Sequence, residues 1–200
     1  MITRESITGV ILAGGLGRRL SADGAGVAKG LVRFRDATLI DYVLSRFAPQ
    51  VGHLLLNVDT ARGDYRHLGI PLIADRLPGH LGPLAGVHAA LASADTSWLA
   101  TAPCDTPFLP RDLVLRLADA IEAGTGTEIA LARTGQRRHP LCMLVHRRVL
   151  PSLHAYLEEG GRSVEGWVER SQAVWVTFDD EHAFTNINTP SDLNDHARPR

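Results

Sequence analysis

The sequence predicts one α/β domain built on a mostly parallel sheet. Short apolar segments alternate with amphipathic helical patterns along the whole chain, and no repeat or low-complexity linker divides them. With 200 residues, of which 44% are hydrophobic and 22% charged, the chain has the size and composition of a single globular domain. We therefore treat residues 1–200 as one domain.

The first half of the chain opens with an apolar, partly β-branched segment at residues 7–13, which ends in two glycines and is typical of a buried strand. The other extended segments expected in this half are residues 31–34, 53–58, 71–75 and 98–102. The helices expected here are residues 39–47, where apolar side chains recur at helical spacing, and residues 83–94, which open with proline. Ligands bind at the carboxyl ends of parallel strands, so polar residues that follow these strands are the first candidates for a site.

The second half continues the alternation. An amphipathic helix is expected at residues 111–123, where Gly124 ends it, and further helices at residues 147–158 and 164–170. The strands expected in this half are residues 128–132 and 141–145, on either side of a polar turn at 135–139, and residues 173–178, whose alternation predicts a half-buried antiparallel strand. A last helix is expected to begin at Thr189, which has proline after it and an acid three residues on.

Charge and cysteine content exclude several classes of protein. A formal net charge of −1 gives no general attraction for nucleic acid. The apolar run at residues 54–56 is far short of the roughly 18 residues that a membrane helix needs. Residues 1–9 carry charges of both signs and lack the apolar core of a secretory signal, so we expect a cytoplasmic protein. Cys104 and Cys142 are too few and too far apart for a disulfide framework, and we expect two buried thiols.

Lysine occurs once among the 21 basic residues, at Lys29 in a glycine-rich segment. Arginine occupies every other cationic position. A single compact ammonium therefore suggests a site where a point charge fits and a planar guanidinium does not. On composition alone, a surface lysine retained by chance explains the pattern equally well.

The segment Leu-Ala-Gly-Gly-Leu-Gly-Arg-Arg at residues 12–19 follows the first strand directly. Glycines there let backbone N–H groups turn toward a phosphate, and the two arginines add positive charge. The segment is not a Walker loop, because Ala28 precedes Lys29 and Gly30 follows it. Residues 24–30 also have one residue too many for a dinucleotide fingerprint. A tight connection is the simpler alternative for such a turn.

Taken together, these residues resemble nucleotidyltransferases of the molybdenum cofactor guanylyltransferase type, the MobA family. Residues 12–15, with Arg19 and Lys29 downstream, are similar to the family's opening motif. Further motifs agree in order, namely Asn57, Asp75, Gly-Pro-Leu-Ala-Gly at 82–86, Pro-Cys-Asp-Thr-Pro at 103–107, His-Pro at 139–140 and Asn-Ile-Asn-Thr-Pro at 186–190. The resemblance runs from about residue 7 to 193. It implies a Rossmann-like three-layer fold of the nucleotide-diphospho-sugar transferase type.

The resemblance implies that GMP is transferred from GTP to the terminal phosphate of molybdenum-molybdopterin cofactor, giving molybdopterin guanine dinucleotide and pyrophosphate. Such a transfer needs positioning, a divalent cation and positive charge on the phosphate oxygens, but no protein nucleophile. Asp105 is the expected ligand of Mg²⁺, for which Mn²⁺ can substitute. Lys29 and Arg19 are expected on the triphosphate, and Asn186 and Asn188 at the metal or the incoming phosphate.

The nucleotide-binding residues implied by the resemblance are Leu12, Ala13, Gly14, Gly15, Lys29, Asn57, Asp75, Gly82 and Asp105. A carboxylate that accepts two N–H bonds from guanine would reject adenine and cytosine, because its buried acceptor would otherwise stay unpaired. Asn57 and Asp75 both follow strands and are both candidates, with turn formation as the alternative for each. Gly82 and Gly86 allow close backbone approach to the base or the pterin, or only helix entry.

The resemblance also divides the domain into a nucleotide-binding half, about residues 7–110, and an acceptor-binding half, about residues 111–193. Arg137, Arg138, His139 and Arg162 lie in the second half and suit a phosphorylated pterin, although a solvated turn explains them nearly as well. The expected partners are GTP and the molybdopterin cofactor, with transient contact to molybdoenzyme apoproteins or their chaperones.

Two departures from the family pattern bear on the loop over the triphosphate. Ala28 stands where family members have Asp, and residues 21–27 lengthen the segment before Lys29. The alternatives are the same chemistry with CTP or another phosphorylated acceptor, and a non-catalytic module that binds the nucleotide or cofactor. Intact Asp105 and Lys29 favour an enzyme.

Overall fold

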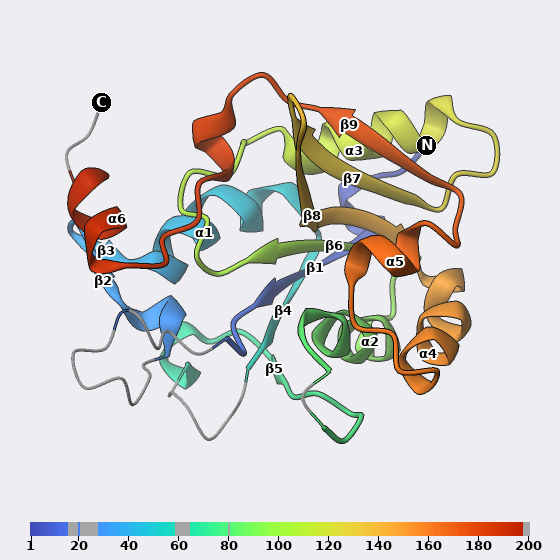
Figure 1. Ribbon diagram of the computed structural model, residues 1–200, viewed down its shortest axis with the longest axis horizontal. Helices are drawn as coiled ribbons and strands as arrows, with labels where there is room; N and C mark the ends of the chain where they lie inside the picture. The colour runs from blue at the N-terminus through green and yellow to red at the C-terminus, as the bar shows by residue number, and fades with distance from the viewer. Residues whose placement is uncertain (16–19, 21–27, 59–64, 80, 198–200) are drawn as a thin grey trace.

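The computed structural model describes residues 1–15, 20, 28–58, 65–79 and 81–197. They form a seven-stranded sheet in the order β5-β4-β1-β6-β8-β7-β9, with helices on both faces (Figure 1). The strands β5 (Leu72–Ile73), β4 (His53–Asn57), β1 (Ile7–Leu12) and β6 (Trp98–Pro103) run parallel to one another. The expected α/β architecture with a mostly parallel sheet is confirmed.

The strand β1 lies inside the sheet, and all of its residues are buried. Its side chains alternate between two cores on opposite faces. Ile7 and Ile11 belong to the core that contains α1 (Leu39–Phe47) and α3 (Leu113–Ala123). Val10 and Leu12 belong to the core that contains α2 (Pro83–Ser93), α4 (Leu150–Glu158) and α5 (Val164–Val168). Burial on both faces explains why this strand is continuously apolar rather than alternating.

Helices cover both faces of the sheet and complete the three layers. The helices α1 (Leu39–Phe47) and α3 (Leu113–Ala123) pack on one face, and α2 (Pro83–Ser93), α4 (Leu150–Glu158) and α5 (Val164–Val168) on the other (Figure 1). A capping box starts α1, in which Thr38 and Asp41 satisfy each other's backbone N–H groups. Among the helices of the described residues, none is long and apolar enough to cross a membrane.

The second half of the chain adds β8 (Arg137–His146), β7 (Ile129–Thr134) and β9 (Ala173–Thr177) to the sheet. β8 is antiparallel to both β6 and β7, whereas β9 is parallel to β7. The expectation of an antiparallel strand at residues 173–178 was therefore wrong. The connection through α4 and α5 leaves the end of β8 and starts β9 at the same edge of the sheet, where β7 also begins, so β9 runs opposite to β8 and therefore parallel to β7.

A bulge interrupts β8 beside the parallel half of the sheet. The consecutive residues Leu131 and Ala132 of β7 face Met143 and His139 of β8, so residues 140–142 lie outside the regular pairing. Proline at position 140 cannot donate a ladder hydrogen bond, which suits it to a bulge. The strands expected at residues 128–132 and 141–145 are confirmed as β7 and β8, but β8 begins at Arg137, inside the polar turn expected at residues 135–139.

A small hairpin lies apart from the main sheet. The segment expected as a strand at residues 31–34 begins as a 3-10 turn, η3 (Lys29–Leu31), and continues as β2 (Arg33–Phe34), which pairs with β3 (Ala37–Thr38). Helix α6 (Pro190–Asp195) lies at the same end of the molecule (Figure 1). The Arg35 guanidinium joins the two by donating to the carbonyl of His196 at 2.9 and 2.7 Å. The end of the chain is thereby tied back to its first quarter.

Candidate active site

The carboxyl ends of β1, β4 and β6 meet at one edge of the sheet, where backbone hydrogen bonds continue past the strands. The Ala13 N–H donates to the Asn57 carbonyl at 2.8 Å, and the Cys104 N–H to the Leu12 carbonyl at 3.2 Å. A cleft of about 690 Å³ opens at this edge. The predicted site residues that line it are Leu12, Gly14, Gly15, Lys29, Asn57, Asp75, Gly82, Asp105 and Asn186. One cleft at the switch point of the sheet thus gathers residues from well-separated motifs.

Of the three remaining predicted residues, Asn188 contacts Lys29 without lining the cleft. Ala13 is buried in the core shared with α1 and α3, and the sheet uses its N–H, so only its carbonyl could reach a ligand. Arg19 and residues 21–27 lie outside the described residues.

Lys29 and Asp105 form an ion pair in this cleft. The Lys29 Nζ donates to Asp105 Oδ2 and also to Asn188 Oδ1, the latter at 2.5 Å. The two side chains of the ion pair are only 12% and 10% exposed. Charges held in such a partly dehydrated place interact more strongly than surface charges do. Three residues of distant motifs are therefore coupled through one ammonium group.

The segment that carries the two predicted asparagines is fastened to the end of β6. The Ile187 N–H donates to the Asp105 carbonyl at 2.9 Å, and the Thr106 hydroxyl donates to Asn186 Oδ1 at 3.3 Å. These bonds explain how residues far along the sequence reach an edge built by the first half of the chain.

The start of α6 fixes the backbone at Asn188. The Asp192 carboxylate accepts from the N–H groups of Asn188 and Thr189, both at 2.8 Å. These hydrogen bonds lower the pKa of Asp192, so it remains ionised near neutral pH. The predicted cap at Thr189 is confirmed. It also orients Asn188 toward Lys29.

Asn57 and Asp75 form a second polar pair in the cleft. Asn57 ends β4 and is buried, whereas Asp75 follows β5 and is exposed. The Asn57 carboxamide donates through Nδ2 to Asp75 Oδ1 at 3.0 Å. An amide that orients a carboxylate in this way leaves the rest of the carboxylate available to a ligand in the cleft.

Helix α2 begins at the cleft with Gly82 and Pro83. Gly82 has a φ of 70°, a left-handed conformation that favours glycine. Its position agrees with the expected close approach of backbone to a ligand. Gly86 does not line the cleft and instead packs against the Asn57 side chain.

The two cysteines are buried, as expected. Burial, followed by the nearby Asp105 carboxylate, raises the pKa of the Cys104 thiol to about 12. Burial likewise raises the pKa of Cys142. Neither thiol is a thiolate near neutral pH, so neither can act as a nucleophile at this site.

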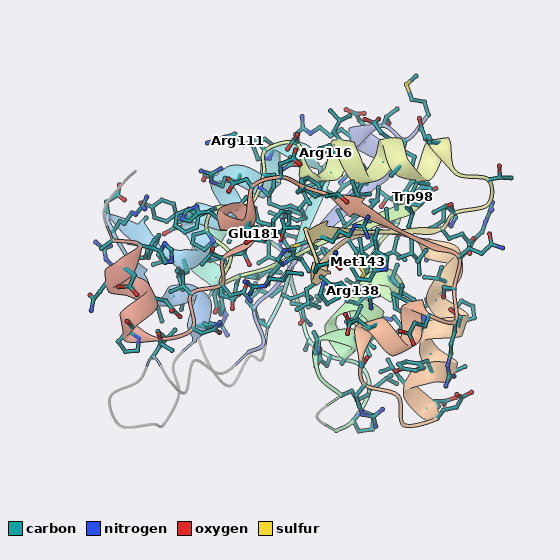
Figure 2. All side chains as sticks on the ribbon, turned by 45° about the horizontal axis from the view of Figure 1, so that its top comes forward. Trp98, Arg111, Arg116, Arg138, Met143 and Glu181 are labelled. Carbon is teal, nitrogen blue, oxygen red and sulfur yellow. The ribbon has the colours of Figure 1, made fainter. Side chains whose placement is uncertain are left out.

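The basic residues singled out in the second half make structural contacts. The Arg162 guanidinium donates to the carbonyls of Leu157 and Gly161 at the end of α4. Arg138 lies on β8 (Figure 2) and pairs with Glu165 of α5 at 3.6 Å. Solvated or structural positions therefore account for both without an anionic ligand.

His139 is a buried residue. Its Nε2 lies 2.8 Å from the Thr134 hydroxyl, and its ring stacks on Phe184 at 4.4 Å. Burial, followed by the charge of Arg137, lowers the pKa of His139 to about 4, so the ring is neutral near pH 7. A neutral, stacked imidazole is unsuited to binding a phosphate by charge.

The residues at the site that were given no role from the sequence include Leu141 and Thr106. Leu141 lines the cleft because the bulge in β8 projects it there, and Thr106 orients Asn186. Proline at position 140 within an apolar strand pattern was the available indication of the bulge. For Thr106, its place beside Asp105 was the only indication.

A family model described as a MobA-like NTP transferase domain matches residues 9–174 of the chain. A protein of Cupriavidus pinatubonensis named molybdenum cofactor guanylyltransferase is 43% identical over 201 residues, which cover 98% of each chain. A protein of the same name from Ralstonia pickettii is 42% identical over 209 residues, which cover 100% of each chain.

Solved structures share the fold at low sequence identity. The molybdopterin-guanine dinucleotide biosynthesis protein A of Archaeoglobus fulgidus superposes with a TM-score of 0.72 at 24% identity, covering 95% of this chain and 96% of that one. The 2-C-methyl-D-erythritol 4-phosphate cytidylyltransferase of Thermus thermophilus has a TM-score of 0.67 at 17% identity, covering 94% and 96%. The same fold therefore occurs in proteins named for different nucleotides.

Proposed function

This chain belongs to the family of MobA-like NTP transferase domains, and we propose that it transfers GMP from GTP to the terminal phosphate of the molybdenum-molybdopterin cofactor. The products are molybdopterin guanine dinucleotide and pyrophosphate. The observation that carries the proposal is the Lys29 ammonium held between Asp105 and Asn188 in a cleft of about 690 Å³ at the ends of parallel strands. A nucleotidyl transfer needs positive charge on the phosphate oxygens, which the ammonium can supply, and a divalent cation, which the carboxylate can hold.

The reaction is a displacement at the α-phosphorus of GTP. An oxygen of the acceptor's terminal phosphate forms a bond to that phosphorus, and the bond from the α-phosphorus to the bridging oxygen breaks, releasing pyrophosphate. The acceptor supplies the nucleophile, which agrees with the raised pKa of the Cys104 thiol. The chain's work is to orient the two substrates and to stabilise charge on their oxygens.

The donor groups of the site fit a divalent cation. Asp105 Oδ2 and Asn188 Oδ1 already converge on a positive charge, the Lys29 ammonium. The described residues hold no cluster of three or more His, Cys, Asp or Glu side chains that could bind a metal. Mg²⁺ suits such a site, because it is usually held by one or two carboxylates with phosphates and water filling its octahedron. When bound, the ion would polarise the phosphate oxygens, and Asp105 is the residue proposed to hold it.

Lys29 is proposed to bind the triphosphate and the leaving pyrophosphate. A phosphate oxygen offers the ammonium a stronger partner than the amide of Asn188 does. Because the side chain is mostly buried, a new negative charge nearby is stabilised more than it would be at the surface. Arg19 is proposed to act beside it.

Asn57 and Asp75 are proposed to recognise the base. Guanine presents an N–H and an amino group side by side, and a carboxylate can accept both. The hydrogen bond from Asn57 to Asp75 supports Asp75 as the acceptor and Asn57 as the group that orients it. The remaining nucleotide contacts are proposed at residues 12–15, of which Leu12, Gly14 and Gly15 line the cleft, and at Gly82, which lines it as well.

Residues 111–193 are proposed to bind the pterin acceptor, with Leu141 and Asn186 as the parts that reach the cleft. The proposal also places the reaction in the cytoplasm, with transient handover of the product to a molybdoenzyme apoprotein or its chaperone.

The decisive experiment measures pyrophosphate release from GTP, CTP and ATP with Mg²⁺, in the presence and absence of molybdopterin cofactor. We expect release from GTP, dependent on the cofactor. Release from CTP would replace the proposed nucleotide with cytidine while keeping the chemistry. Binding of GTP without release for any acceptor would overturn the proposed enzyme in favour of a binding module.

A further inference from the structure

Leu12 and Asn57 stand opposite each other where β1 and β4 end, and helix α2 crosses directly over them. The two residues are paired in the parallel register. Gly86, in the first turns of α2, lies against both side chains. A Cβ built on Gly86 would stand 2.4 Å from Asn57 Oδ1, 2.8 Å from Asn57 Cγ and 2.9 Å from Leu12 Cδ2. No side chain larger than hydrogen fits there without moving a neighbour.

The two neighbours differ in their ability to move. The Leu12 contact is a terminal methyl group, which can rotate away. Asn57 is buried at the strand end, and its carboxamide is held by the 3.0 Å hydrogen bond to Asp75. A side chain at position 86 would therefore displace the Asn57 carboxamide and disrupt its hydrogen bond to Asp75. Glycine inside a helix is unfavourable relative to alanine, so its presence here calls for a reason of this kind.

We propose that Gly86 is a positioning residue for base recognition: it seats the Asn57 carboxamide, which in turn holds the Asp75 carboxylate toward the base. This inference rests on the proposed function, because it assumes that the cleft receives a guanine nucleotide. It assigns Gly86 an action through Asn57 rather than a contact with the base or the pterin. Specificity for guanine then depends on a glycine that never touches the nucleotide.

Gly9 provides a matched control on the opposite face of the sheet. A Cβ at Gly9 would stand 2.8 Å from Phe47 Cε1 and 2.9 Å from Val51 Cγ2, so a neighbour would have to move there too. These neighbours belong to the core beneath α1, which contains none of the base-recognition pair. Gly9→Ala should therefore lower the melting temperature while leaving the preference among nucleotides unchanged.

The test is a double-mutant cycle between Gly86→Ala and Asn57→Ala. Binding of GTP is measured by equilibrium dialysis without acceptor, and KM and kcat are measured for GTP and for ITP, which lacks the guanine amino group. Gly86→Ala is expected to weaken GTP binding and raise KM about tenfold, the effect of misplacing one charge-assisted hydrogen bond, with kcat within about threefold. The preference for GTP over ITP should fall by a similar factor.

In the Asn57→Ala background, where the carboxamide is absent and only the rotatable Leu12 methyl group remains close to position 86, Gly86→Ala should cost little further in GTP binding or selectivity. The inference is overturned if the glycine substitution costs as much there as in the wild type, or if Gly86→Ala alone preserves the preference for GTP. If Gly86→Ala does not fold, recovery of the melting temperature in the double variant supports the contact, and its absence overturns it.

Failure of the proposed function gives a different result. A wild-type protein that binds GTP but releases no pyrophosphate would overturn the transferase, while the dialysis cycle would still decide the role of Gly86.

Discussion

The two halves of the sheet use the same kinds of residue for different purposes. In the parallel half, Lys29, Asp105 and Asn57 are drawn together in one cleft at the strand ends. In the half made of β8, β7 and β9, His139 packs against Phe184 and Arg162 caps α4. Residue type does not separate the two groups, since each contains cationic and polar side chains. Their position relative to the carboxyl ends of the parallel strands does.

This difference has a physical basis. The carboxyl ends of parallel strands lie at a common edge of the sheet. The polar residues that follow these strands converge there, and their side chains do not take part in the hydrogen bonds of the sheet. In the second half, β8 runs antiparallel to β6. Its carboxyl end therefore lies at the opposite edge of the sheet from the carboxyl ends of the parallel strands. The bulge at residues 140–142 is the exception, because it projects Leu141 into the cleft from the antiparallel strand.

The strongest test of the parallel half is Asp105→Asn. The amide keeps the shape of the side chain but loses the charge, and the backbone carbonyl that accepts from Ile187 is unchanged. We expect kcat for pyrophosphate release to fall by on the order of 10³-fold, because the proposed metal site loses its carboxylate. The melting temperature should also fall, because the mostly buried Lys29 ammonium loses its charged partner, so kcat is measured well below it. Asp180→Asn, at an exposed cap of the second half, is the control and should retain full activity. Activity of Asp105→Asn within tenfold of the wild type would remove Asp105 from the proposed metal site.

Lys29→Arg should have the next largest effect. The charge is kept, but a planar guanidinium is larger than the ammonium that lies between Asp105 and Asn188 in a mostly buried position. We expect kcat/KM for GTP to fall by about 10²-fold, as expected for a misplaced charged group. Steady-state kinetics measures the effect. Lys29→Met, which removes the charge, is measured alongside, and the comparison of the two variants separates the effect of shape from that of charge. If Lys29→Arg matched the wild type, the solitary lysine would carry no functional meaning.

Much of the fold could be predicted because its determinants are local. The continuous apolar run of β1, proline at the start of α2 and the cap at Thr189 each fix an element within a few residues. The direction of β9 could not be predicted in this way. It depends on which strand β9 pairs with, and that pairing is set by the long connection through α4 and α5.

The site was predictable to a different degree. Motif positions predicted which residues would gather, but not that the Lys29 ammonium would join Asp105 to Asn188, because that contact spans most of the chain. The close approach of a ligand expected at Gly86 stays a prediction; the structure shows the Asn57 and Leu12 side chains beside it, because glycine in a sequence indicates a close approach without indicating what approaches. For His139, burial decided its charge, and burial is not visible in a short polar segment.

The second half should respond to pH through stability rather than through binding. Because the pKa of His139 is lowered to about 4 in the folded protein from 6.5, the unfolded chain binds more protons between these values. The stability that depends on neutral His139 is complete above about pH 6.5 and is lost as the pH falls toward 4. We expect His139 to contribute a loss of about 2 kcal/mol in the free energy of unfolding between about pH 7.5 and 5. Urea unfolding of the wild type and His139→Gln across this range measures it, and parallel curves for the two would contradict it.

The smallest effect is expected from Arg162→Ala. Its guanidinium donates to the carbonyls of Leu157 and Gly161 at 2.9 and 2.6 Å, so removal should lower the free energy of unfolding by about 1 kcal/mol. The KM for the pterin acceptor should not change, because these bonds engage the chain itself. Arg170→Ala, which removes an exposed ion pair with Glu159 near the same helix end, is the control and should leave stability unchanged. The opposite pattern, a raised acceptor KM with unchanged stability, would place Arg162 in the acceptor site. It would also show that the second half binds substrate through side chains that the ligand-free protein uses as helix caps.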